Sequence, residues 1–121
     1  MGMDTVSRGH RGEQVAAEYI KRKGYKVLEQ NYRLRKGEID LIAQDGDTLV
    51  FCEVKTWRTY GTEQLHYSID RMKRKRILSL AKVYLREHPE YEGKGVRFDV
   101  IFVRGESGRV EHYLHAFDEE Q

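Results

Sequence analysis

The sequence predicts one α/β domain over residues 1–121, with a mixed central sheet flanked by helices. Apolar residues recur at helical spacing in two segments, and five other segments are short, strand-like runs bounded by turn signals. The order is helix, three strands, helix, two strands (αβββαββ), and a helix between strands is typical of a crossover connection. The composition, 39% hydrophobic and 35% charged, is typical of a folded, highly charged domain rather than a disordered chain.

The first element is expected to be a helix over residues 7–23. Ala16 and Ile20 recur at helical spacing, and Gly24 is placed to end the helix. Glu13 lies three and seven residues before these apolar positions, at the edge of the buried stripe rather than on the solvent face. It is therefore either an ion-pair partner at the edge of the core or a ligand supplied by this helix.

Three strands are expected next, over residues 25–34, 38–44 and 48–55. Asp45-Gly46 is a strong two-residue turn signal between the second and third. Both faces of this hairpin are apolar, and strands covered on both faces belong in the middle of a sheet. Alternation places one apolar set on one face, namely Ile39, Leu41, Ala43, Val50, Cys52 and Val54, and a second set on the other, namely Ile42, Leu49 and Phe51.

The second helix is expected over residues 69–87, after a polar, aromatic loop at residues 59–67. Two more strands, at residues 96–103 and 110–117, complete the predicted sheet. The apolar stripe of the second helix consists of Ile69, Met72, Ile77, Leu80, Ala81 and Tyr84.

The charged residues of the hairpin predict a metal site. With a two-residue turn at residues 45–46, Asp40 lies opposite Phe51. Alternation along the strands then places Asp40, Glu53 and Lys55 on one face. The two acids become diagonal neighbours, about 7–8 Å apart at the backbone. Two carboxylates extended across that distance can hold one Mg²⁺, which prefers oxygen ligands.

A cation in this position favours a phosphodiester as substrate, because it polarises phosphoryl oxygens and lowers the pKa of a bound water. Lys55 would hold that water and offset charge on the phosphorus. The alternative is that these charges are only solvated or ion-paired, as charges near strand ends commonly are. Glu38, at the start of its strand, is interpreted as a bystander.

The second helix carries a basic block, with five cations in the six residues RMKRKR. Arg71, Lys73, Arg74 and Arg76 form either a solvated helix surface or a phosphate-binding face, and a metal site nearby favours the second interpretation. Trp57, just after the hairpin, either stacks on splayed bases or packs locally in the loop.

Several other classes of protein do not fit the sequence. The single cysteine, Cys52, cannot form an internal disulfide and is expected in the core, which favours a reducing cytoplasm. No apolar stretch approaches the ~20 residues of a membrane helix, and the first residues contain no apolar signal core. His112 and His115 are three apart in a predicted strand and point to opposite faces, so a structural zinc site is not expected.

The pattern of Asp40 followed by Glu53 and Lys55, after a helix that carries Glu13, resembles the PD-(D/E)xK nuclease superfamily. More closely, the chain resembles the YraN-type family of bacterial proteins, which are regarded as predicted endonucleases distantly similar to archaeal Holliday-junction resolvases. The segments that carry the resemblance are RGEQVAAEYI, NYR, GEIDLIA, LVFCEVK, RFDV and HAF, together with Lys73. Ile39 stands where the superfamily pattern has a proline.

The resemblance implies a restriction-endonuclease-like core that contains a Mg²⁺ or Mn²⁺ site. Asp40 and Glu53 would bind the metal, Lys55 would be the catalytic lysine and Glu13 the acid from the first helix. The expected function is metal-dependent hydrolysis of DNA, with branched or repair-intermediate DNA as one substrate class and RNA left open. The alternative is a nucleic-acid-binding module that keeps this fold and cuts nothing. A homodimer is suggested because two cuts require two sites.

Overall fold

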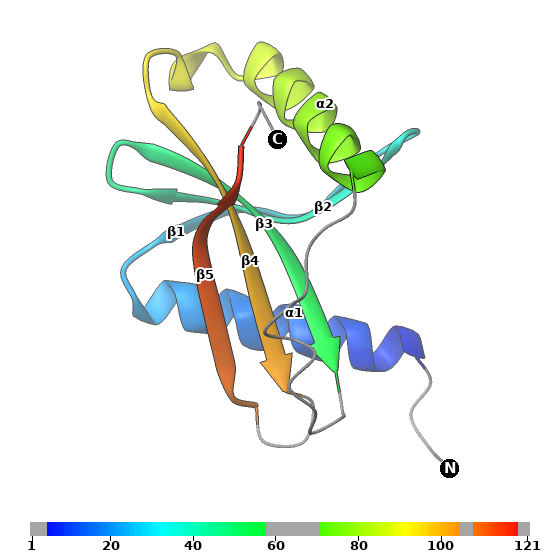
Figure 1. The fold of residues 1–121 in the computed structure, drawn as a ribbon. Coiled ribbons are helices and arrows are strands. Elements are labelled where there is room, and N and C mark those ends of the chain that lie inside the picture. Colours follow the sequence, from blue (N-terminus) through cyan, green and yellow to red (C-terminus); the bar gives the residue numbers. More distant parts are fainter. Residues whose placement is uncertain (1–4, 58–70, 105–107, 119–121) are drawn as a thin grey trace.

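The computed structural model describes residues 5–57, 71–104 and 108–118. Within these residues the chain forms two α-helices, one short 3-10 helix and five strands. Figure 1 shows their arrangement. In chain order these are α1 (Thr5–Arg22), β1 (Lys26–Leu34), β2 (Gly37–Asp45), β3 (Thr48–Trp57), α2 (Arg71–Glu87), η2 (Pro89–Tyr91), β4 (Gly95–Arg104) and β5 (Val110–Phe117). Within the described residues, neither α-helix combines the length and apolarity needed to cross a membrane.

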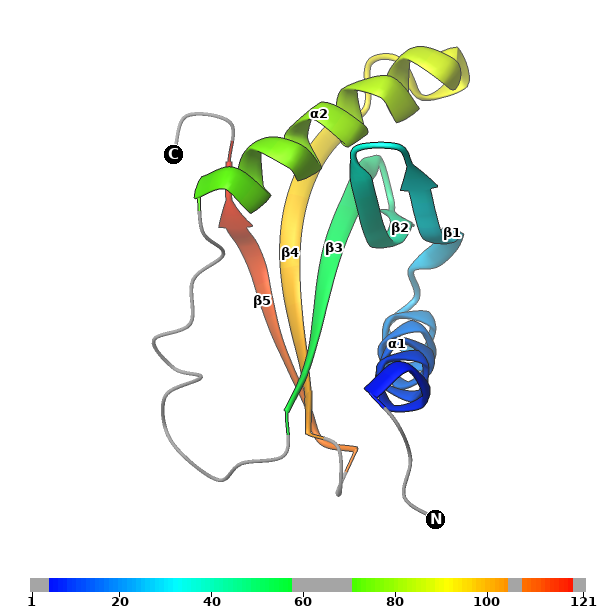
Figure 2. The same cartoon turned by 90° about the vertical axis from the view of Figure 1, so that its right-hand side faces the viewer.

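The strands form one mixed sheet in the order β1-β2-β3-β4-β5. β3 and β4 pair in parallel, and the other neighbours are antiparallel. A parallel pair requires a crossover, and α2 lies in the connection from β3 to β4. The two helices pack on opposite faces of the sheet, with α1 on one side and α2 on the other (Figures 1 and 2).

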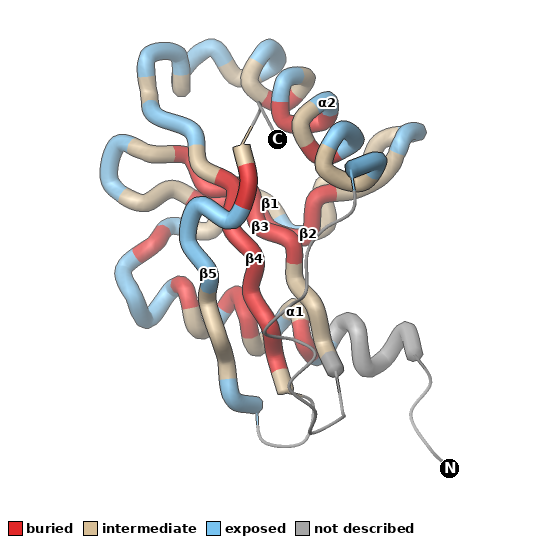
Figure 3. Tube along the Cα trace, in the orientation of Figure 1, coloured by how far each residue is buried: buried red, intermediate tan, exposed pale blue. Residues whose placement is uncertain are grey.

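Each face of the sheet has its own apolar layer. The layer under α2 includes Phe51, Leu80 and Tyr84, and the layer under α1 includes Ala16, Ile20, Leu41, Cys52 and Ile101. The buried stretches follow the middle strands, whereas much of β5 and the turns are exposed (Figure 3). The middle strands are therefore covered on both faces, as the two apolar sets of the hairpin predicted.

The predicted class, element order and crossover are confirmed, and most boundaries agree within one or two residues. The expected loop at residues 59–67 and the first predicted residue of the second helix, Ile69, lie outside the described residues. Met72 was expected in the buried stripe of this helix, but its side chain is 64% exposed. The buried residues of α2 begin at Ile77, because the residues before it are exposed or, like Lys73, line a polar pocket instead of the apolar layer.

The hairpin turn differs from the sequence prediction. Asp45 pairs with Thr48, so the turn residues are Gly46 and Asp47 rather than Asp45 and Gly46. Gly46 has a φ of 60°, the conformation that a type II′ turn requires at its first central position. Asp40 therefore does not lie opposite Phe51, whose partner is Ile42. The shift involves one residue on each strand, so the alternation of faces across the hairpin is preserved.

The expected face of Ile39 is also wrong, because the alternation of faces along β2 breaks between Ile39 and Leu41. Ile39 packs in the layer under α2 together with Ile42, whereas Leu41 packs under α1. Asn31, which lies between the paired residues of β1 opposite this point, has a φ of 57°. A left-handed residue interrupts regular alternation, and asparagine tolerates this conformation better than most residues.

A buried charge network on β4 links this strand to β5 and to Tyr25, which follows α1. Asp99 is fully buried and accepts hydrogen bonds from Arg97 at 3.0 and 3.1 Å and from His112 Nε2 at 2.7 Å. Burial disfavours the charged carboxylate, but the bonds from His112 and Arg97 outweigh it and hold the pKa of Asp99 below its ordinary value. Arg97 in turn reaches Tyr25 at 2.7 Å. Asp99 and Arg97 therefore form a structural ion pair within β4.

β5 contains an irregularity opposite Asp99. Phe98 pairs with Phe117 and Val100 with Tyr113, so three residues of β5 lie across from Asp99 alone. His115, the middle one, has a φ of 55°, and its N–H donates to Asp99 at 2.9 Å. The Asp99 carboxylate therefore stabilises the bulge in β5 in addition to its bonds with Arg97 and His112.

We expect Asp99→Ala to lower the free energy of unfolding by about 3 kcal/mol or more, because it leaves Arg97 without its buried partner. Asp45→Ala removes the other carboxylate that contacts Arg97, at 3.3 Å, but this side chain is 43% exposed. Its loss should cost less than about 1 kcal/mol. Urea unfolding of both variants measures the difference, and equal losses would contradict a buried role for Asp99.

Candidate functional site

The site is organised where β2 and β3 separate. Their backbone pairing runs from Asp45 and Thr48 to Leu41 and Cys52, and ends there. At the next position a side chain of β2 replaces the backbone as hydrogen-bond acceptor: Asp40 Oδ2 accepts the Val54 N–H at 2.8 Å. This bond satisfies an amide that the ladder no longer reaches and fixes the direction of the carboxylate.

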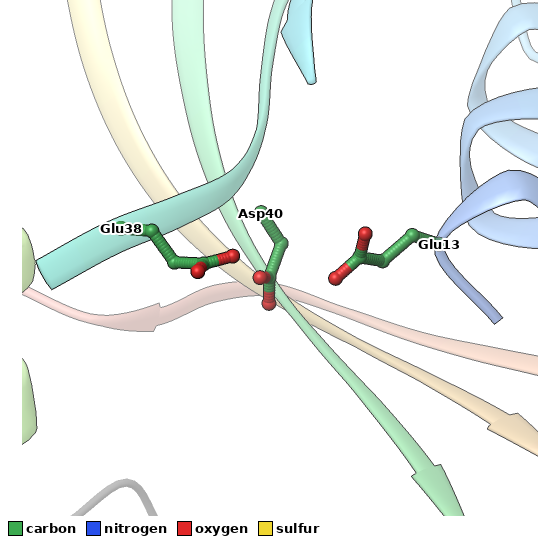
Figure 4. Close-up of side chains that lie close together, drawn as sticks. All are labelled: Glu13, Glu38 and Asp40. Atoms are coloured by element: carbon green, nitrogen blue, oxygen red, sulfur yellow. The ribbon is translucent and has the colours of Figure 1, made fainter. Parts of the chain in front are cut away.

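Three carboxylates converge at this point from two elements. Glu38 and Asp40 project from β2, and Glu13 reaches toward them from α1 (Figure 4). One oxygen from each lies within 4.8 Å of the others. Asp40 is only 8% exposed, whereas the two glutamates are partly exposed. The arrangement is a cluster of hard oxygen donors with one buried member, the kind that divalent cations such as Mg²⁺ and Mn²⁺ prefer.

A glycine in α1 allows Glu13 to come this close. A Cβ built on Gly12 would overlap the Thr56 side chain of β3, so only glycine fits the present spacing of helix and strand. Gly12 is buried at this contact. The neighbouring Glu13 is thus held at the edge of the α1 layer, next to the strand that carries Asp40.

A pocket of about 370 Å³ lies beside the acidic cluster. Its charged lining residues are Glu38, Asp40, Glu53, Lys55, Lys73 and Arg76. Acids from β2 and β3 therefore face bases from β3 and α2 across one small space. Glu53 is 5% exposed and forms an ion pair with Lys73, which comes from the first turn of α2.

The pKa of Asp40 is raised to about 8, from an ordinary 3.8. Burial is the largest cause, followed by the nearby charge of Glu53, with smaller contributions from Glu13 and Glu38. The hydrogen bond from Val54 opposes the shift. The site therefore concentrates more negative charge than its surroundings stabilise, which is a condition that a bound cation relieves.

The structure brings five of the sequence-predicted residues into one pocket: Asp40, Glu53, Lys55, Lys73 and Arg76. Glu13 does not line this pocket but lies next to Asp40 in the acidic cluster. Arg71 and Arg74 lie in the same first turns of α2 but do not line the pocket. Trp57 ends β3, and its side chain lies outside the described part of the structure.

Glu38 was interpreted as a bystander, yet it belongs to the cluster. The available signal was its spacing, because residues two apart on a strand share a face, and Glu38 is two residues before Asp40. The interpretation placed Glu38 against Glu53 through the assumed turn. In the observed register, extended by one pair, the residue opposite Glu53 would be Asp40.

The fold and site together define an α/β protein with a five-stranded mixed sheet and two helices, consistent with a restriction-endonuclease-like core and carrying a cluster of acids. The model of the Uncharacterised protein family UPF0102 matches residues 12–103. The chain therefore belongs to this family, and the expected YraN-type membership is confirmed. The matched region contains Glu13, Asp40, Glu53, Lys55 and Lys73.

Similar proteins share this family name over nearly their whole length. The UPF0102 protein of Syntrophus aciditrophicus is 46% identical over 114 residues, covering 91% of this chain and 87% of that protein. The UPF0102 protein of Persephonella marina is 40% identical over 111 residues, covering 92% and 93%. That of Geobacter metallireducens is 38% identical over 122 residues, covering 98% of each.

We expect Asp40→Asn to stabilise the protein more at pH 8 than at pH 5 when a chelator is present. Between 3.8 and about 8 the native state holds more protons on Asp40 than the unfolded chain, so wild-type stability falls as pH rises. The slope is at most about 1.4 kcal/mol per pH unit. Asparagine does not ionise, so the variant lacks this slope, and its amide oxygen can still accept the Val54 N–H.

Urea unfolding at pH 5, 6, 7 and 8 measures this difference. Glu18→Gln, which changes an exposed carboxylate of α1, serves as the control. The interpretation of Asp40 would be contradicted if the stability gap between variant and wild type showed no greater pH dependence than that of the control.

Proposed function

We propose that this protein is a Mg²⁺- or Mn²⁺-dependent endonuclease that hydrolyses DNA phosphodiesters. The observation that carries the proposal is one pocket in which buried acids of β2 and β3 face Lys55, with cations of α2 on the opposite wall. Acids alone are common on protein surfaces. Two acids that can hold a divalent cation, with a lysine in the same pocket to offset charge on the phosphorus, can together support phosphodiester hydrolysis.

The donor set fits a divalent cation. Asp40 and Glu53 would hold it from the two strands, and Glu38 and Glu13 add oxygen donors on either side of Asp40 (Figure 4). The pKa of Asp40 is raised first by burial and then by the charge of Glu53, and a cation bound at this position would offset both effects. When bound, the cation would supply Lewis-acid activation of the phosphodiester.

Lys55 is the side chain that would act directly on the attacking water during hydrolysis. It lines the pocket two residues after Glu53, on the same strand. Its ammonium group would orient the attacking water toward the phosphorus and offset the negative charge that develops there. Burial of Glu53 and Asp40 lowers the local dielectric, so these electrostatic effects are stronger than they would be in water.

The cations of α2 would hold the nucleic-acid backbone. Arg71 and Arg76 are exposed, and Arg76 and Lys73 line the pocket. The first turn of α2 contains no acidic residue, so its positive charges and the helix dipole act together on a nearby phosphate. Phosphate contacts of this kind position DNA without reading its sequence, which suits recognition of DNA structure.

We expect cleavage of DNA in Mn²⁺ or Mg²⁺ to fall by about 100-fold or more in Asp40→Asn and in Lys55→Ala. Glu18→Gln, on the exposed side of α1, should retain wild-type activity. Nicking of supercoiled plasmid and of branched duplexes measures the rate. If the protein binds DNA in chelator but cleaves it in no metal, the endonuclease proposal is wrong and the non-catalytic binding module is favoured.

We expect the double variant Arg71→Ala/Arg76→Ala to reduce the salt dependence of DNA binding. Each phosphate contact contributes about 0.9 to the slope of log affinity against log salt, so losing two should lower the slope by about 2. Arg86→Ala, in the last turn of α2, is the matched control and should leave the slope unchanged. Fluorescence anisotropy from 50 to 200 mM salt tests both. An unchanged slope in the double variant would mean that these arginines of α2 do not contact DNA phosphates.

A further inference from the structure

The ion pair between Lys73 and Glu53 joins the two walls of the pocket. Glu53 comes from β3 and is 5% exposed, and Lys73 comes from α2 and is 32% exposed. A carboxylate this deeply buried requires a countercharge. Lys73 supplies a positive charge to an acid that the proposed function assigns to a divalent cation.

The two roles are incompatible at the same time. A cation held by Asp40 and Glu53 would place a second positive charge next to the Lys73 ammonium, and like charges at this range repel strongly in a poorly solvated pocket. Lys73 has an alternative position within reach, because its side chain is long and partly exposed and starts from a basic, acid-free helical turn. A phosphate group entering the pocket would be attracted to that turn.

We propose that Lys73 exchanges partners: it neutralises Glu53 before the metal binds and moves to a phosphate of the nucleic acid when the metal takes Glu53. This inference rests on the proposed function and adds a regulation of the same site. A cation that takes Glu53 releases Lys73 for phosphate, and a phosphate that takes Lys73 releases Glu53 for the cation. Metal and DNA therefore bind with positive coupling, and linkage makes the coupling equal in both directions.

The first test is the affinity for Mn²⁺ in the absence of DNA, measured by calorimetry. Lys73→Met removes the competing ammonium and should tighten Mn²⁺ binding by about fivefold or more. Arg76→Met removes the same charge from the same pocket and should tighten binding less. Lys73→Arg keeps a cation beside Glu53 and should remain close to wild type. Thermal melting of each variant establishes that it is folded.

The second test measures coupling with DNA in a Lys55→Ala background, in which the DNA should stay intact. The ratio of Mn²⁺ dissociation constants without and with a short duplex should exceed about fivefold. Adding Lys73→Met should lower this ratio severalfold, to the coupling that direct contact between cation and phosphate provides. Adding Arg76→Met should weaken DNA binding and leave the ratio unchanged.

The outcomes separate the two proposals. If the wild-type protein binds no Mn²⁺, or if Asp40→Asn binds it equally well, the metal site and the partner exchange both fail. If binding depends on Asp40 but Lys73→Met and Arg76→Met have the same effect, or Lys73→Met weakens Mn²⁺ binding, only the exchange is overturned. Tighter Mn²⁺ binding together with reduced coupling in Lys73→Met, but not in Arg76→Met, supports it.

Discussion

The hydrogen bond from Val54 to Asp40 is the interaction on which the site depends. It forms where the ladder between β2 and β3 ends, and it replaces a backbone pair with a side-chain acceptor. The strands can thus part without leaving a buried amide unsatisfied, and the carboxylate remains fixed among other acids. Mutual repulsion among those acids opposes this arrangement, so the apolar layers on both faces of the sheet must hold it in place.

The separation of the strands also explains how helices on opposite faces serve one site. Under a continuous sheet, α1 and α2 would be separated by the strand layer. At the end of the ladder, Glu13 from α1 approaches Asp40, while Lys73 from α2 pairs with Glu53 in the adjoining pocket. The acidic side of the site therefore depends on α1 and its close contact at Gly12, and the basic side depends on α2.

Periodicity was sufficient to predict the elements, their order and the crossover, because each strand and helix buries a face that its own residues define. Acids at Asp40 and Glu53 with Lys55 close by were also predictable, since a hairpin of either register keeps the same alternation. Three features were beyond local patterns. The turn at Gly46-Asp47 competed with an equally good signal one residue earlier. The alternation of faces along β2 breaks between Ile39 and Leu41, and the Lys73–Glu53 pair joins residues that only the tertiary fold brings together.

The bulge in β5 has a consequence for how copies of this protein can associate. An open sheet edge is a template on which another strand can add, and regular, flat edges are the most effective templates. β5 is such an edge, but the three residues across from Asp99 and the left-handed His115 break its hydrogen-bonding rhythm. Asp99 holds this bulge in place. The buried carboxylate of the charge network therefore also disfavours edge-to-edge association through β5, which favours solubility at high concentration.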